Sequence, residues 1–186
     1  ITGAFERALP VDALDTWNTG EAWQGMINWI GKYDHLVADC NATINHPGLL
    51  EQLREEKFDA AFGETISWCM AGLFHLAGIE KFAITESITY KDGVFGLHQV
   101  AAVPSYVPSV MGGSFGDEMT FLQRAYNMFN HLVYIQYNYW PLKQYQKMFQ
   151  SNYPGFPDII DLMSNNSLYF LNSDPLVDFP RPTAAR

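Results

Sequence analysis

The chain has 186 residues, enough for one domain with its own hydrophobic core. Hydrophobic residues make up 48% and aromatic residues 15%, which is typical of a folded globular protein and excludes a largely disordered one. The 20 acidic side chains outnumber the 11 Lys and Arg, so the formal net charge is -9. Nucleic acid and anionic membrane surfaces are therefore poor candidates for partners.

The first residue is Ile1 rather than Met, and neither a signal-peptide pattern nor a run of about 18 apolar residues is present. From the beginning at Ile1 and the abrupt end at Arg186 we expect a piece of a longer protein. Cys40 and Cys69 are the two cysteines. Buried free thiols are the favoured interpretation, and a single disulfide in an oxidising compartment is the alternative.

Two sequons permit N-glycosylation if the chain enters a secretory lumen, at Asn41 and at Asn165. The five histidines show no spacing typical of metal ligands, so we expect no metal site. Neither a G-x-G-x-x-G fingerprint nor a Walker A sequence occurs, and no cofactor is expected.

Residues 1–16 have little periodicity and predict a loop or an edge. Helical spacing of apolar residues then predicts an amphipathic helix over residues 21–35. Pro47 is suited to the first turn of a second helix, which ends in the charged and solvated residues 54–57.

The next thirty residues alternate between strand and helix patterns. The apolar run over residues 58–63 predicts a buried strand, residues 66–79 predict a helix that Gly78 ends, and residues 81–85 predict a second buried strand. Strand, helix and strand at this spacing form a βαβ unit, which implies parallel strands and a right-handed crossover.

Residues 87–116 predict a long ordered loop, and long loops inside compact domains are often functional. Asp117 is predicted to cap a long helix that Pro141 kinks or breaks. This helix carries an apolar and aromatic stripe from Phe121 to Trp140 that we expect to lie in the core, with a wall for a lipophilic acceptor as the less favoured alternative. The stripe consists of Phe121, Leu122, Ala125, Met128, Phe129, Leu132 and Val133, continued by Tyr134, Tyr137 and Trp140.

The last part of the chain predicts two further elements and a tail. Pro157 is suited to open a short helix over residues 158–163, and residues 168–171 predict a third strand. The proline-containing tail over residues 174–182 is extended and resembles a linker.

Glu64 is the candidate catalytic residue, because it follows the first predicted strand directly. In parallel α/β sheets, ligands bind outside the carboxyl ends of the strands. A carboxylate at that edge can orient a histidine that acts as a general base. The alternative is a structural charge at the start of the next helix, where negative charge is stabilised by about 0.3–1 kcal/mol.

Ser114 lies in a G-x-S-x-G sequence over residues 112–116, the pattern of the nucleophile elbow in α/β-hydrolases. That motif needs a strand directly before it, and Pro104 and Pro108 interrupt the approach. The only later histidine, His131, precedes the later acidic residues of the helix at 158–163, which is the wrong order for a hydrolase triad. A serine hydrolase is therefore the least favoured hypothesis.

Several segments, in this order, resemble the N-terminal domain of the animal UDP-glucuronosyltransferases, and nematode members look most similar. They cover most of residues 50–182 and comprise residues 58–64 with Cys69, Gly72-Leu73-Phe74, Gly78-Ile79, Pro104-Ser105-Tyr106-Val107-Pro108, residues 117–121 with Arg124 and Asn127, and residues 172–176 and 178–182.

The resemblance implies the Rossmann-like N-terminal domain of a two-domain GT-B glycosyltransferase, α/β in class, with an incomplete parallel sheet flanked by helices. Residues 1–182 would be part of the acceptor-binding domain, and residues 183–186 would begin the connection to a C-terminal donor-binding domain. The implied reaction is inverting transfer of glucuronic acid or another hexose from a UDP-sugar co-substrate to the hydroxyl of a small lipophilic acceptor. The implied location is the endoplasmic reticulum lumen, with a membrane-anchoring segment C-terminal to this chain and oligomerisation possible.

In this family a histidine deprotonates the acceptor and an acidic residue orients that histidine; the acidic position falls on Glu64, where many members have Asp. The histidine would lie upstream of Ile1 and the donor half after Arg186, so we expect the chain alone to be inactive. Predicted acceptor contacts, with ordinary packing as the alternative, are Trp68, Ser87, Tyr90 and Phe95. A non-catalytic lipophile-binding module is the alternative function.

Overall fold

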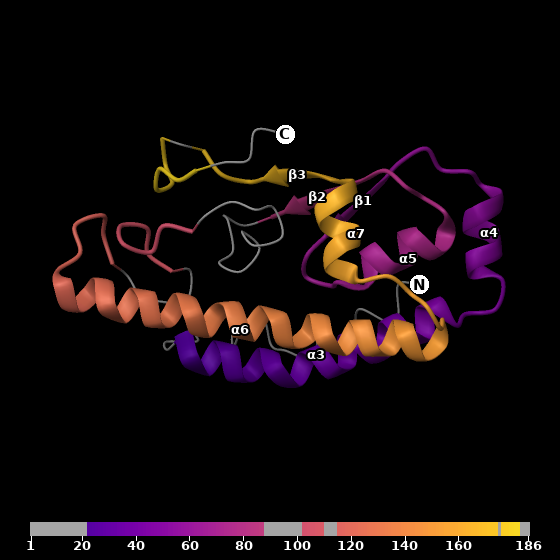
Figure 1. Cartoon of the computed structure of the whole chain (residues 1–186), viewed down its shortest axis with the longest axis horizontal. Coiled ribbons are helices and arrows are strands. Elements are labelled where there is room, and N and C mark those ends of the chain that lie inside the picture. The colour runs from indigo at the N-terminus through magenta and orange to yellow at the C-terminus, as the bar shows by residue number, and fades with distance from the viewer. Residues whose placement is uncertain (1–21, 88–101, 110–114, 175, 183–186) are drawn as a thin grey trace, which may run out of the picture.

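The computed structural model describes residues 22–87, 102–109, 115–174 and 176–182, with side chains omitted for 22–31, 166 and 167. Helices and strands alternate along most of this chain (Figure 1). The elements are α3 (Ala22–Ile44), α4 (Leu49–Glu55), β1 (Ala61–Glu64), α5 (Cys69–Ala77), β2 (Phe82–Glu86), α6 (Phe121–Asn152), α7 (Ile159–Asn166) and β3 (Ser167–Leu171).

The three strands form one parallel sheet in the order β1-β2-β3. Glu64 pairs in register with Thr85, and Thr85 pairs with Phe170. The predicted βαβ unit and the predicted third strand are therefore confirmed. Gly78 follows α5 with φ of 80°, a left-handed conformation that favours glycine, and it ends this helix as the sequence predicts.

One face of the sheet packs against helices. The residues on this face come from all three strands and pack in or against the hydrophobic core: Ala61, Phe82, Ile84 and Tyr169. Below the sheet in Figure 1 lie α5 and α7, and below these α3 and α6 run side by side. The described part of the chain is thus an α/β structure with helices stacked on one side of a short sheet.

The opposite face carries Phe62, Leu168 and Phe170, whose exposed fractions are 70%, 57% and 53%. Successive side chains of a strand point to opposite faces, so these residues alternate with the buried set. Together with Phe82 and Ala83 they line an open groove of about 610 Å³.

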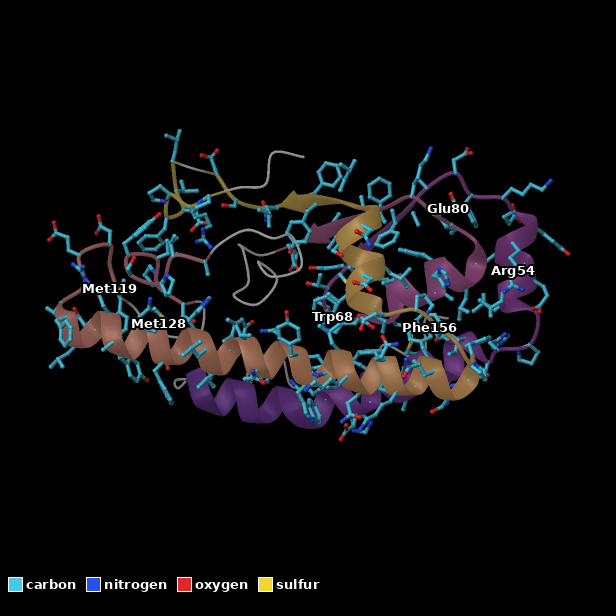
Figure 2. All side chains as sticks on the ribbon, in the orientation of Figure 1. Arg54, Trp68, Glu80, Met119, Met128 and Phe156 are labelled. Carbon is cyan, nitrogen blue, oxygen red and sulfur yellow. A yellow bond between two sulfur atoms is a disulfide. The ribbon has the colours of Figure 1, made fainter. Side chains whose placement is uncertain are left out.

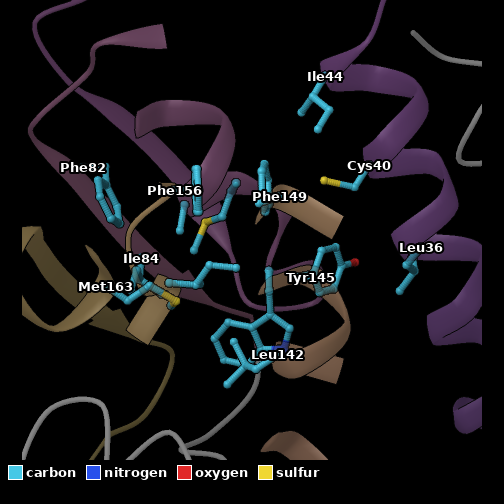
Figure 3. Packing of buried hydrophobic residues seen from close by; sticks show 14 residues of the cluster. Leu36, Cys40, Ile44, Phe82, Ile84, Leu142, Tyr145, Phe149, Phe156 and Met163 are labelled. Atoms are coloured by element: carbon cyan, nitrogen blue, oxygen red, sulfur yellow. The ribbon is translucent and has the colours of Figure 1, made fainter. Parts of the chain in front are cut away.

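The core is built around the C-terminal half of α6 (Figure 3). Tyr145 and Phe149 are fully buried there, and Phe149 stacks on Phe156 with ring centroids 4.6 Å apart. Gly72 on α5 lies against Phe149, where a Cβ would overlap the ring. Close approach of α5 to α6 therefore depends on a glycine at position 72.

Cys40 and Cys69 form a disulfide that joins α3 to the first residue of α5. The interpretation as free thiols was wrong, because packing of α3 on α5 brings the two Cα atoms to 5.6 Å, within the range that a disulfide spans. The bond closes a loop with a sequence separation of 29 residues. In the chain-entropy account such a loop contributes roughly 3–4 kcal/mol to stability.

The long helix α6 begins later and ends later than its sequence signals suggest. Its N-cap is Thr120 rather than Asp117, and Thr120 and Gln123 form a capping box. The helix continues through Pro141, so the prediction of a break there was wrong. Pro141 is almost completely buried against the core, which holds the helix on both sides of the missing N–H.

Residues 121–133 of the predicted stripe on α6 are largely exposed, so their predicted place in the core was wrong, whereas Tyr134 in its aromatic continuation is buried as predicted. Phe121 and Leu122 have exposed fractions of 82% and 77%. Met128, labelled in Figure 2, is exposed as well, together with Phe129 and Leu132. The buried side of this half is instead polar, and consists of Asn127, Asn130, His131, Tyr134 and Asn138.

Candidate functional site

Glu64 ends β1 at the carboxyl edge of the sheet, as the sequence predicts. Its Oε1 atom accepts two hydrogen bonds from Ser87, one from the backbone N–H at 3.0 Å and one from the hydroxyl. Ser87 directly follows β2, so two neighbouring strand ends meet at this carboxylate. The structure thus brings together two of the residues that the sequence singled out.

A second carboxylate, Glu86, lies beside the first on the inner side of the sheet. Glu86 is only 3% exposed, and its Oε1 atom accepts a hydrogen bond from the hydroxyl of the equally buried Thr65. Sequence reasoning missed both residues. The signal that selected Glu64 was also available for Glu86, since it follows the apolar run of the second strand directly.

The third strand contributes Asn172, which follows β3. Its backbone N–H donates to the carbonyl of Glu86 at 3.2 Å, and its side chain donates to the carbonyl of Ser87 at 2.9 Å. Residues after all three strands therefore meet at one edge. This is the edge at which parallel α/β proteins bind their ligands.

Tyrosines of α3 and α6 lie beneath Glu86. Burial raises the pKa of Tyr33; a hydrogen bond with Tyr137 opposes this rise, and the negative charge of Glu86 adds to it. Burial also raises the pKa of Tyr137, and Tyr33 and Tyr134 raise it further. Both phenols are consequently neutral at physiological pH and serve as hydrogen-bonding groups under the edge.

Tyr145 supports the same region from the core. Burial raises its pKa to about 12, although a hydrogen bond with Ser67 acts in the opposite direction. The two side-chain oxygens are 3.1 Å apart. Ser67 precedes α5 and follows Glu64 by three residues, so this bond anchors the segment between β1 and α5 to α6.

The other predicted site residues lie elsewhere. Trp68 is 2% exposed and belongs to the hydrophobic core (Figure 2). Tyr90 and Phe95 lie outside the described residues, as does Ser114. Residues 102–109, which are described, contain no strand, and this agrees with the argument from Pro104 and Pro108 against a hydrolase elbow.

The two sequons differ in their surroundings. Asn41 lies on α3, where its Oδ1 atom accepts hydrogen bonds from Asn45 at 3.1 Å and from Asn152 at 2.9 Å. Asn165 is exposed on α7 and lines the open groove of the sheet. Both asparagines are exposed, and they differ in that the side chain of Asn41 is held by hydrogen bonds.

The open groove is not at the carboxyl edge. Its lining includes Ala60, Glu80 and Lys81, which precede the strands, so it lies toward their amino ends. Glu80 is labelled in Figure 2, on the side of the sheet remote from Met119. We therefore base the candidate site on the carboxyl-edge residues rather than on this groove.

Within the described residues, no group of three or more His, Cys, Asp and Glu side chains is arranged to hold a metal ion. Among the same residues, no helix combines the length and apolar character that a membrane crossing requires.

A parallel sheet with helical connections and two carboxylates at its carboxyl edge defines an α/β protein with a candidate ligand site at that edge. Residues 10–185 match the family model described as UDP-glucoronosyl and UDP-glucosyl transferase. The match covers nearly the whole chain, and the chain belongs to this family. For this family the α/β architecture is that of a GT-B glycosyltransferase.

Individual relatives agree with this assignment. A putative UDP-glucuronosyltransferase of Caenorhabditis elegans, ugt-48, is 30% identical over 176 residues, which cover 91% of this chain and 32% of the relative. Human UDP-glucuronosyltransferase 1A10 is 30% identical over 82% of this chain and 28% of its own length. The 2-hydroxyacylsphingosine 1-beta-galactosyltransferase of Mus musculus is 27% identical over 81% and 27%.

The chain thus spans about a third or less of the length of these relatives. No solved structure matches it significantly.

Proposed function

We propose that this chain is part of an inverting UDP-glycosyltransferase that transfers glucuronic acid or another hexose to the hydroxyl of a small lipophilic acceptor. The observation that carries the proposal is Glu64, held by Ser87 at the carboxyl edge of the sheet in a chain of this family. Residues 1–182 would belong to the acceptor-binding domain, and residues 183–186 would begin the connection to the donor-binding domain. The relatives' lengths support the view that further chain completes the enzyme.

In the proposed reaction the acceptor oxygen forms a bond to the anomeric carbon of the sugar while the bond from that carbon to the UDP oxygen breaks. The acceptor proton passes to a histidine base, and Glu64 orients this histidine and stabilises the imidazolium that forms. Positioned general bases of this kind contribute about 10²–10⁴-fold in rate. Because the base and the donor site lie outside this chain in the proposal, the 186 residues alone would not turn over substrate.

For the acceptor we propose contacts from the segment after β2, with Tyr90 and Phe95 as the apolar candidates. Ser87 opens this segment beside Glu64. Trp68 packs in the core directly after Ser67, so we propose that it supports the edge from beneath. A lipophilic acceptor would then lie over the carboxyl edge.

We further propose the lumen of the endoplasmic reticulum as the location, with anchoring by a segment C-terminal to this chain. The Cys40–Cys69 disulfide supports an oxidising compartment, since structural disulfides persist there. N-glycosylation would fall on Asn165 in preference to Asn41, because both side chains are exposed but the amide oxygen of Asn41 is engaged by Asn45 and Asn152.

The test is turnover by the full-length protein containing this sequence, assayed with UDP-glucuronic acid, UDP-glucose and UDP-galactose against a panel of phenols and lipid alcohols. Glu64→Gln should lower kcat by about 10²-fold or more and leave acceptor binding near the wild-type value. Glu56→Gln is the matched control, because Glu56 is an exposed carboxylate at the C-cap of α4. Acceptor binding without turnover by the wild type would instead indicate a non-catalytic lipophile-binding protein.

A further inference from the structure

The ends of β1 and β2 each carry an acid next to a hydroxyl, in opposite order along the chain. Glu64 and Thr65 follow one another at the first strand, and Glu86 and Ser87 follow one another at the second. Each hydroxyl donates to the carboxylate of the other strand. The two strand ends are therefore joined by a reciprocal pair of side-chain hydrogen bonds.

Adjacent residues at a strand end point to opposite sides of the sheet. The bond between Thr65 and Glu86 is buried on the side of the helices, whereas the bond between Ser87 and Glu64 is on the open side, where Ser87 is exposed. The buried bond can thus hold the two strand ends together. The exposed bond restrains the Glu64 carboxylate, which a substrate or a base can reach.

From this geometry we propose that Ser87 is a positioning residue for Glu64 rather than a contact of the acceptor. The inference rests on the proposed function, since it assigns Glu64 the task of orienting the base. Two donors of one residue, the backbone N–H and the hydroxyl, converge on the single atom Oε1 of Glu64. They fix both the place and the rotation of the carboxylate.

The need for such support follows from the length of the side chain. Glutamate has one more rotatable bond than aspartate, and long side chains lose more rotamer entropy when they are ordered. A carboxylate that orients a base must be held within roughly 0.5 Å of its productive place. The hydroxyl of Ser87 supplies this restraint, and Asn172 in turn holds the carbonyl of Ser87 at 2.9 Å.

The buried hydrogen bond between Thr65 and Glu86 supports the exposed hydrogen bond between Ser87 and Glu64. Burying a carboxylate is costly unless it receives hydrogen bonds, and Thr65 provides one to Glu86. Glu86 and Ser87 are consecutive, so whatever fixes Glu86 under the sheet also fixes the backbone N–H of Ser87 at its edge. Glu86 and Thr65 are therefore structural residues. Their hydrogen bond fixes the backbone of Ser87, and Ser87 in turn positions the carboxylate of Glu64.

The experiment compares Ser87→Ala, Ser87→Thr and the control Ser151→Ala in the full-length enzyme. Ser151 is exposed in the last turn of α6 and donates to Lys147. We expect Ser87→Ala to lower kcat about tenfold with KM for acceptor and UDP-sugar unchanged, because the bond to the charged carboxylate is lost without loss of a substrate contact. Ser87→Thr keeps the hydroxyl and should recover most of kcat.

The pH profile gives a readout that general destabilisation would not move. Loss of the Ser87 hydroxyl removes a hydrogen bond that shares the charge of the Glu64 carboxylate, so the carboxylate attracts the protonated histidine base more strongly and this base gives up its proton at higher pH. The acidic limb of kcat should move to higher pH in Ser87→Ala and stay in place in Ser87→Thr and Ser151→Ala.

Each other outcome counts against the inference. A rise in KM for the acceptor at unchanged kcat would make Ser87 an acceptor contact. Unchanged kcat, KM and pH profile in Ser87→Ala would show that Glu64 needs no such support. If the wild-type protein shows no turnover, the proposed function and this inference both fail. The first two outcomes are seen only when the wild type is active, so the wild-type assay separates the two cases.

Discussion

The side chain of Asn127 accepts a hydrogen bond from the backbone N–H of Ser109 at 2.7 Å, and it thereby ties the second turn of α6 to the segment before the helix. Its amide also donates to the carbonyls of Pro104 and Val107, at 2.7 and 2.8 Å. Asn127 is completely buried. Residues 104–108 and the start of α6, two of the segments that resemble the family in sequence, are therefore in contact. The side-chain amide of Asn127 holds this turn against the helix.

We expect Asn127→Ala to destabilise the protein by about 3 kcal/mol, because three backbone groups of the turn lose their partner at a buried place. Asn127→Asp is the informative companion, since a carboxylate still accepts from Ser109 but faces two carbonyls without donors. Limited proteolysis should cut near residues 104–109 in both variants. A cleavage rate equal to that of the wild type would contradict the role of Asn127 in holding the turn.

Replacement of Gly72 by Ala tests the contact between α5 and α6. Alanine is favoured over glycine inside a helix by about 1 kcal/mol, yet its Cβ would overlap the Phe149 ring. Overpacking should dominate and lower the free energy of unfolding by about 1–3 kcal/mol. Gly116→Ala is the control, since a Cβ there meets nothing within 4 Å. Urea denaturation followed by tryptophan fluorescence compares the two, and equal midpoints would refute the close packing.

The disulfide predicts a dependence of stability on reducing agent. Cys40→Ser with Cys69→Ser removes the bond without leaving a lone thiol, and should lower the free energy of unfolding by roughly 3–4 kcal/mol. Wild type measured in dithiothreitol should approach the double variant, whereas the double variant itself should not respond. Mass spectrometry of unreduced peptides checks the pairing directly, and recovery of both cysteines as free thiols from protein isolated from the endoplasmic reticulum would disprove it.

Tyr145 predicts a loss of stability at alkaline pH. Burial raises its pKa to about 12 from the ordinary 10, so the folded state holds the phenol proton more tightly than the unfolded state does. Its contribution is complete below pH 10 and is lost as the pH rises toward 12; a shift of this size corresponds to about 2–3 kcal/mol.

Tyr145→Phe cannot ionise and should show a shallower decline in stability between pH 10 and 12, although it loses the bond to Ser67 at every pH. Tyr33 and Tyr137 remain in the variant and act in the same direction, so the decline is reduced rather than abolished. Stability curves of the two proteins at pH 8 and pH 11 decide the matter. Parallel curves would exclude Tyr145 as a source of the alkaline sensitivity.

The sheet and its edge were largely predictable from the sequence because their signals are local. The apolar runs around Phe62 and Ile84, together with Gly78, specify two strands and the helix between them. Parallel pairing then places Glu64 and Ser87 at one edge by geometry alone. Thr65 and Glu86 adjoin the same strand ends, so the same local signal also predicts them at this edge.

The rest depends on contacts between distant segments. Helical periodicity shows that Phe121, Leu122 and Phe129 share a side of α6, but it does not show which side packs, and here the amide of Asn127 lies inward instead. The pairing of Cys40 with Cys69 depends on how α3 crosses α5, which no local pattern encodes.

The order of the strands has a geometrical consequence for the open face of the sheet. In β1-β2-β3 every step along the chain goes in one direction across the sheet, and right-handed connections that share a direction lie on the same side. If further strands were added beyond β3 in the same direction, the helices that connect them would lie on the face that α5 and α7 already cover. Helices over Phe62, Leu168 and Phe170 require connections that cross the sheet in the opposite direction, to strands added beside β1. The strand order therefore specifies the edge from which a helical layer on this face would be built.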